Sequence, residues 1–225
     1  MKIKRNSDVL KSTLDLSKKK ILDVGSGEGH LTRMMTEEGG EVIGLECTAR
    51  QLEKAMSYNK VGNETYVDAV AQSLPFEDQS FDIIIFFNSL HHIPVDDQFT
   101  ALCEAARVLK SKGYIYISEP IAEGPHFELL KPIDDETFVR AKAYEVIKRF
   151  EEAGLNWITE EVYNHPVRRK SFEEMRDKLT GPNPEREKIF VEQDAQLRES
   201  FKQLGQHEDG FTYFDQPTRM NLLQK

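Results

Sequence analysis

The sequence predicts an α/β fold, doubly wound, in which a mostly parallel sheet carries helices on both faces. Short and almost entirely apolar segments, such as residues 21–24 and 81–87, are typical of strands buried on both faces. Segments with the apolar spacing of helices alternate with these strands, and a glycine-rich turn follows the first strand. This alternation indicates parallel pairing through crossover helices.

The first two thirds of the chain contain most of the expected elements. Strands rich in β-branched or aromatic residues are predicted over residues 21–24, 41–46, 65–70, 81–87 and 114–118. Helices are predicted over residues 28–38, 48–58, 96–110 and 134–153. Gly39–Gly40 ends the first helix, and Thr48–Gln51 fits a capping box that begins the second. Gly113 is expected to stop the third helix, and Gly154 the fourth, which is capped by an aspartate at 134–135.

The last third of the chain has a different pattern. A strand is expected over residues 157–167, a helix over 185–204 and a closing strand over 218–224. Ser171–Glu174 fits a second capping box, and Pro182 and Pro184 break the helix that it begins. We therefore expect one domain over residues 1–225, made of an N-terminal segment (1–19), a core (20–167), a helical insertion (168–214) and a closing edge strand (215–225).

Composition limits the classes of function. The chain has 225 residues, 39% hydrophobic and 31% charged, with a net charge of −9, which is typical of a globular protein. The longest apolar run is too short for a membrane span, and the acidic balance disfavours nucleic acid as a partner. The basic run Arg168–Lys170 is interpreted as a solvated strand end. We expect a cytoplasmic protein in which Cys47 and Cys103 are free thiols.

The glycine-rich turn is the most informative segment. Glycines at 25, 27 and 29 follow the strand Ile21–Val24, where the absence of a Cβ lets a ligand approach the backbone. Their spacing departs from the Gly-x-Gly-x-x-Gly pattern of dinucleotide sites, because position 30 is His. This departure argues against a nicotinamide-dependent oxidoreductase.

Asp23-Val-Gly-Ser-Gly-Glu-Gly29 resembles the first motif of class I S-adenosylmethionine-dependent methyltransferases. The branch with the ubiquinone and menaquinone biosynthesis enzymes is the most similar. Further blocks of the family follow in order over about residues 15–120, namely Glu46, residues 71–76, 81–85, 88–92 and 105–113. The resemblance implies a Rossmann-like, seven-stranded sheet with one antiparallel strand, and a cofactor site at the carboxyl ends of its strands.

The resemblance also implies roles for individual residues. Glu46 is expected to accept hydrogen bonds from the two ribose hydroxyls, as a carboxylate can. The other predicted cofactor residues are Asp23 near the methionine end, the loop Gly25, Ser26, Gly27 and Gly29, Cys47, Ala71 and Gln72 near adenine, and Asn88 beside the sulfonium. Val70 stands where many relatives carry an adenine-binding Asp, and Asp68 is not assumed to replace it.

Candidate catalytic residues follow the fourth and fifth strands. His91 and His92 are candidate general bases, and either instead caps or packs under the following helix. Glu119 either contacts substrate or only ends its strand before Pro120. Adjacent histidines project apart and no third ligand is evident, so no metal is expected. Residues 121–142 are the candidate segment for closing the acceptor pocket, and His126 and Phe127 either line that pocket or lie in a surface loop.

The sequence therefore predicts an enzyme that transfers a methyl group from S-adenosylmethionine to a small-molecule acceptor, with no nucleic-acid or membrane partner. A sensor or scaffold that binds the cofactor without turnover is the alternative from another class. The motifs predict binding equally for both, and they leave the acceptor and the oligomeric state open.

Overall fold

The computed structural model describes residues 1–181 and 183–225, which divide into two compact units. The sheet unit contains residues 6–119, 139–161 and 219–225, and the helical unit contains residues 1–5, 120–138 and 162–218. The two long strands β6 (Asn156–Arg169) and β8 (Phe211–Gln224) have residues in both units. None of the described helices is long and apolar enough to cross a membrane.

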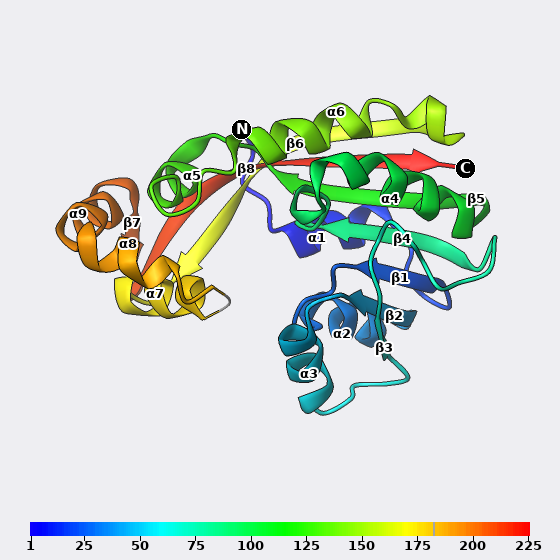
Figure 1. The fold of residues 1–225 in the computed structure, drawn as a ribbon, viewed down its shortest axis with the longest axis horizontal. Coiled ribbons are helices and arrows are strands. Elements are labelled where there is room, and N and C mark those ends of the chain that lie inside the picture. The colour runs from blue at the N-terminus through cyan, green and yellow to red at the C-terminus, as the bar shows by residue number, and fades with distance from the viewer. Residues whose placement is uncertain (182) are drawn as a thin grey trace. The chain divides into compact units, whose positions relative to one another are not determined.

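One sheet has the strand order β3-β2-β1-β4-β5-β8-β6, and a short β7 (Gln206–Glu208) pairs only with β8 (Figure 1). The remaining strands are β1 (Lys20–Val24), β2 (Glu41–Glu46), β3 (Thr65–Asp68), β4 (Phe81–Phe87) and β5 (Leu109–Pro120). The pairs β1–β2, β1–β4, β2–β3 and β4–β5 are all parallel. These observations confirm the predicted Rossmann-like class, with seven strands side by side across the sheet.

The closing strand does not lie at the edge of the sheet. β8 lies between β5 and β6, so the expectation of an edge strand over residues 215–225 needs correction. Backbone bonds join Lys112 to Lys225 and Ile121 to Pro217, so β8 runs antiparallel to β5. The burial of β8 explains its interior place, because most of its residues are buried while β6 is largely exposed or half-buried.

Helices connect the strands of the sheet unit. Their bounds are α1 (Asn6–Thr13), α2 (His30–Glu37), α3 (Ala49–Ser57), η1 (Leu90–His92), α4 (Val95–Val108), α6 (Thr137–Ile147) and η2 (Phe150–Ala153). Helix α1 was not expected. Gly113 does not stop α4: the chain enters β5 at Leu109, and Gly113 lies in an irregular stretch, because Phe81 pairs with Leu109 while Ile83 pairs with Tyr114.

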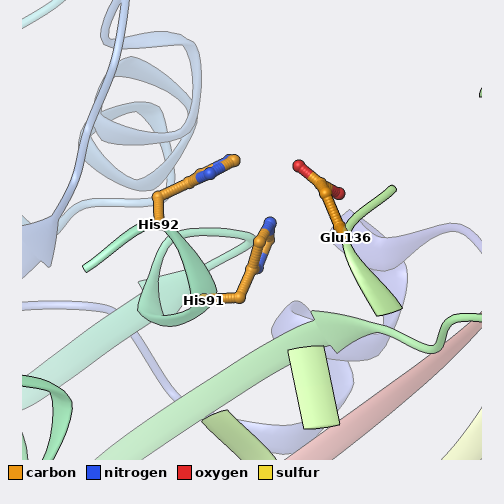
Figure 2. A group of neighbouring side chains, drawn as sticks. All are labelled: His91, His92 and Glu136. Atoms are coloured by element: carbon orange, nitrogen blue, oxygen red, sulfur yellow. The ribbon is translucent and has the colours of Figure 1, made fainter. Parts of the chain in front are cut away.

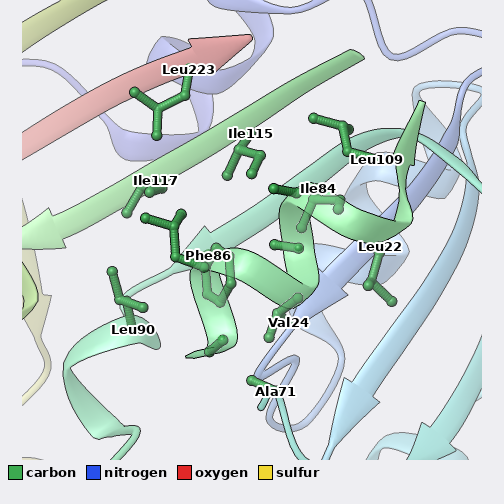
Figure 3. Close-up of a cluster of buried hydrophobic side chains, with 14 of the residues drawn as sticks. Leu22, Val24, Ala71, Ile84, Phe86, Leu90, Leu109, Ile115, Ile117 and Leu223 are labelled. Carbon is green, nitrogen blue, oxygen red and sulfur yellow. The ribbon is translucent and has the colours of Figure 1, made fainter. Parts of the chain in front are cut away.

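Strand alternation separates the two faces of the sheet. Leu22, Val24, Ile84 and Phe86 point to one face, where they form a buried apolar cluster with residues of α4 and α6 (Figure 3). Asp23 points to the opposite face, where Thr32 of α2 contacts it. Helices therefore cover both faces, which leaves the strand ends as the place where polar side chains can gather.

The helical unit has its own core. Its helices are α5 (Gly124–Leu130), α7 (Phe172–Thr180), α8 (Arg186–Glu192) and α9 (Asp194–Leu204), which lie close together in Figure 1. Phe172, Phe190, Phe201 and Phe214 form edge-to-face contacts in a buried cluster. The single helix expected over 185–204 is two helices, because Gln193 is not helical. The predicted break at Pro182 lies outside the described residues.

Ser171 caps α7 with its hydroxyl oxygen, which accepts a bond from the Glu174 N–H at 3.1 Å, as the sequence predicted. Thr48 precedes α3 at the expected position, yet its side chain makes no capping bond.

We therefore expect Ser171→Ala to lower the free energy of unfolding by about 1 kcal/mol. Thr48→Ala is the matched control and should cost less than half of that. Urea unfolding of the two variants checks the difference, and equal losses would contradict it.

Candidate active site

The loop after β1 turns sharply at three glycines. Gly25 has φ +76°, Gly27 has φ +55° and Gly29 has φ +73°, all in the left-handed region that favours glycine. A Cβ at Gly25 would lie 2.6 Å from the Ser89 Cβ, so this glycine is needed for close packing. A Cβ at Gly27 would meet no atom within 4 Å, so the loop has open space on that side. Gly27 therefore marks the side from which a ligand can approach the backbone.

The carboxylate of Glu46, at the end of β2, holds this loop. Glu46 Oε2 accepts a bond from the Gly27 N–H at 2.9 Å, and Oε1 accepts one from the Thr48 N–H at 2.8 Å. The side chain is 8% exposed. Each oxygen has a lone pair left for a second donor. Sequence reasoning identified Glu46 but not the contribution of the Thr48 backbone, for which residue type gives no signal.

Asp23 is buried at 1% exposure and faces α2, where the Thr32 hydroxyl donates to its Oδ2 at 2.7 Å. Burial, opposed by the bonds from Thr32 and aided by the negative charge of Glu46, raises the pKa of Asp23 from 3.8 to about 7. Its carboxyl is therefore partly protonated near neutral pH. A cation close to Asp23 would favour the charged form.

The end of β4 is joined to β1 by a residue that the sequence analysis did not single out. The Ser89 hydroxyl donates to the Val24 carbonyl at 2.6 Å, in buried surroundings. Asn88, just before it, is exposed and has φ +53°, and its N–H donates to the Ser118 carbonyl at 2.8 Å. The structure thus brings Asn88 and the glycine loop to the same strand ends, because Ser89 contacts the residues beside Gly25.

Glu119 and His91 form a buried pair at these strand ends. Glu119 Oε1 accepts bonds from the N–H groups of Ser89 at 3.1 Å and Leu90 at 2.9 Å, and Oε2 contacts His91 Nδ1. An ionised carboxylate only accepts, so His91 Nδ1 carries the proton of this bond. His91 is 3% exposed, whereas the neighbouring His92 is exposed (Figure 2). The centroids of the two imidazole rings lie 4.0 Å apart.

The predicted adenine-side residues are placed less uniformly. Ala71 is buried, and Cys47 is exposed next to Glu46. Gln72 donates from Nε2 to Asp97 Oδ2 of α4 at 3.3 Å, so its amide is used between the loop and this helix. Val70 is 41% exposed. Both cysteines are free, as expected.

Comparisons with known proteins match this chain to methyltransferases. A family model for a methyltransferase domain matches residues 22–117. The uncharacterized methyltransferase YcgJ of Bacillus subtilis is 36% identical over 110 residues, which cover 47% of this chain and 43% of YcgJ. The ubiquinone/menaquinone biosynthesis C-methyltransferase UbiE of Shewanella sp. (strain ANA-3) is 32% identical over 156 residues, which cover 65% of this chain and 60% of UbiE. The alignments span about half the length of these relatives.

Solved structures show the same fold. The crystal structure of YcgJ aligns over 97% of each chain with a TM-score of 0.67 and 23% identity. A putative methyltransferase from Bacillus halodurans aligns over 97% of this chain and 96% of its own, with a TM-score of 0.62 and 21% identity. At these identities the likeness is evidence for the fold alone.

Residues 22–117 thus match a methyltransferase domain, and the chain has the fold of class I S-adenosylmethionine-dependent methyltransferases. Over its aligned residues the chain is homologous to YcgJ and UbiE. The predicted resemblance is confirmed.

Asp23 gives a pH dependence of stability with a defined sign. Its folded pKa of about 7 lies above the ordinary value of 3.8, so the folded state binds the extra proton between these values. The stabilisation that protonated Asp23 contributes is therefore fully present below about pH 4 and is lost as pH rises through 7. Relative to Asp23→Asn, which does not titrate, the native chain should lose on the order of 3 kcal/mol between pH 5 and pH 8.

Chemical unfolding of both chains at the two pH values measures this difference. Asp8→Asn, at an exposed carboxylate of α1, serves as the control and should follow the native chain. Parallel curves for the native chain and Asp23→Asn would contradict the predicted burial of charge.

Proposed function

We propose that this chain transfers the methyl group of S-adenosylmethionine to a small-molecule acceptor. The observation that carries the proposal is the Glu46 carboxylate, fixed at 2.9 Å from the Gly27 N–H beside the open side of the glycine loop. Two backbone donors hold this carboxylate in one orientation, which is what recognition of a pair of ribose hydroxyls requires.

The residues present suit the cofactor. The missing Cβ at Gly27 leaves room for a ligand at the backbone, and Cys47 and Asn88 are exposed at the ends of β2 and β4, the strands on either side of β1. Asp23 supplies the negative charge that favours the cofactor's ammonium at the methionine end, directly or through water. When bound, the cofactor supplies an activated methyl group on a good leaving group. The chain then has to orient the acceptor in line and exclude water.

Two observations support a small acceptor. UbiE, one of the relatives, is by name a C-methyltransferase of ubiquinone and menaquinone biosynthesis. The net charge of −9 disfavours a nucleic-acid acceptor. The same chemistry on a ring carbon or a hydroxyl requires removal of a proton from the acceptor.

His91 is the proposed general base, and Glu119 is its positioning residue. The contact of Glu119 with His91 Nδ1 places the proton on that nitrogen, so Nε2 carries the lone pair of the neutral ring. The backbone bonds from Ser89 and Leu90 hold Glu119 in place, so the orientation of the histidine follows from the end of β4. His92, which is exposed, keeps the role of second candidate.

Loss of the Glu46 carboxylate should weaken the cofactor site specifically. We expect Glu46→Gln to lower the affinity for S-adenosylhomocysteine roughly 10- to 100-fold, because a charge-assisted pair of bonds is lost. Glu41→Gln, an exposed acid on the same strand, is the control and should bind as the native chain does. Calorimetric titration measures both.

The same titration separates the alternatives. Binding of NADH in place of S-adenosylhomocysteine would overturn the proposal. Incubation with methyl-labelled cofactor and a small-molecule extract distinguishes an enzyme from a scaffold, because a scaffold binds the cofactor and transfers no label.

Glu119→Gln should lower the rate of label transfer roughly 100-fold while leaving cofactor affinity within about twofold of the native value. A glutamine amide that donates to Nδ1 moves the ring proton to Nε2 and removes the base. His91→Gln should have an equal effect, and His92→Gln a small one. If His92→Gln alone abolishes transfer, the base is His92. A loss in Glu119→Gln without any change in the pH profile would indicate a merely structural role.

A further inference from the structure

Two neighbouring arginines at the end of β6 have different surroundings. Successive side chains of a strand point to opposite faces, so Arg168 and Arg169 diverge while His165 and Arg169 share a face. Arg168 is exposed, with its guanidinium carbon 4.4 Å from the centre of the Phe211 ring. Arg169 is partly buried. The interpretation of a solvated strand end therefore fits Arg168 and not Arg169.

Arg169 makes hydrogen bonds only to neutral groups. Its Nη2 lies 3.3 Å from His126 Nε2 of α5, and its Nη1 donates to the Arg168 carbonyl at 3.1 Å. Its Nε is shielded from solvent and has no hydrogen-bond partner within the described part of the chain. A guanidinium has five N–H donors, so part of its capacity is unused.

The hydrogen-bond pattern determines which ring nitrogen of His126 carries the proton in this contact. Arginine can only donate, so His126 Nε2 accepts and Nδ1 carries the proton. His126 Nδ1 lies 3.3 Å from Gln216 Oε1, which accepts that proton's bond. Gln216 in turn donates from Nε2 to the carbonyls of Ile121 and Pro217, each at 2.8 Å. This chain of bonds fixes the imidazole and the guanidinium, yet it brings no negative charge to Arg169.

No carboxylate oxygen in residues 1–181 and 183–225 lies within 4.0 Å of the Arg169 guanidinium. Glu174 is the acid whose charge raises the pKa of Arg169. The carboxylate oxygens of Glu174, however, accept bonds from the Lys170 N–H and the Lys178 ammonium, both at 2.7 Å. Other arginines of the helical unit do contact carboxylates, namely Arg176 with Glu187, Arg186 with Asp134 and Arg198 with Glu173.

The charges around Arg169 do not compensate for its burial. Burial lowers the pKa of Arg169, against the weaker effect of Glu174. Burial also lowers the pKa of His165, and the cations Arg169 and Arg5 lower it further. Arg169 and Arg5 therefore both lie near enough to His165 to disfavour its charged form.

A cation held away from water without a paired acid is costly, and a bound anion removes that cost. The planar fork of arginine matches the oxygens of a carboxylate or a phosphate. We propose that Arg169, held by His126, forms an anion-binding site that takes a carboxylate or phosphate group of a small molecule.

The test measures binding of inorganic phosphate and, separately, acetate to the full chain, at constant pH and constant ionic strength set with chloride. We expect an anion to raise the melting temperature of the native chain and to shift the imidazole NMR signals of His126 and His165. Arg169→Gln should weaken binding of that anion roughly 10- to 100-fold. Arg168→Gln, the neighbour on the opposite face, should bind within about twofold of the native chain.

Stability without anion separates this role from a structural one. If Arg169 serves the ligand, Arg169→Gln melts at the same temperature as the native chain or higher, because an unpaired charge has been removed. A lower melting temperature together with unchanged anion binding overturns the proposal, as does a native chain that responds to neither anion. The response to phosphate or to acetate then indicates which acidic group is recognised.

Discussion

The bond between the Glu46 carboxylate and the Gly27 N–H is the contact on which the candidate cofactor site depends. It ties the end of β2 to the loop after β1, and the Thr48 N–H holds the other oxygen. Neighbouring parallel strands place their carboxyl ends at the same edge, so one acid can act on the backbone of the next connection. The Ser89 bond to Val24 does the same between β4 and β1.

Much of this arrangement follows from local sequence. The runs Ile21–Val24 and Phe81–Phe87 are apolar because both faces of their strands are covered, and that pattern is readable without any tertiary information. Glu46 and the glycine loop were predicted as cofactor residues because their motifs resemble those of a known family and follow the first two strands along the chain. The pairing of Glu119 with His91 was not predicted, although both residues were candidates. It joins side chains 28 residues apart, which no local pattern encodes.

Other features depend on non-local contacts and escaped sequence reasoning for that reason. The position of β8 between β5 and β6 is set by pairing across the chain, whereas the sequence shows only an apolar run near the C-terminus. Thr48 has the residue type of a cap, yet its N–H binds Glu46 and its side chain makes no capping bond. Arg169 is in a short basic run that looks like a surface feature. Its burial and its contact with His126 distinguish it from Arg168.

The helical unit is assembled from three separate stretches of chain: the first five residues, a middle stretch around α5, and a longer stretch from the second half of β6 into β8. Ile3 bridges to Asn164, so residues 1–5 have to wait for a partner made much later. During synthesis this unit cannot close until β8 has emerged from the ribosome. Because such distant pairings form slowly, the nascent chain keeps strand edges unpaired for longest here, and this unit is where chaperone protection would matter most.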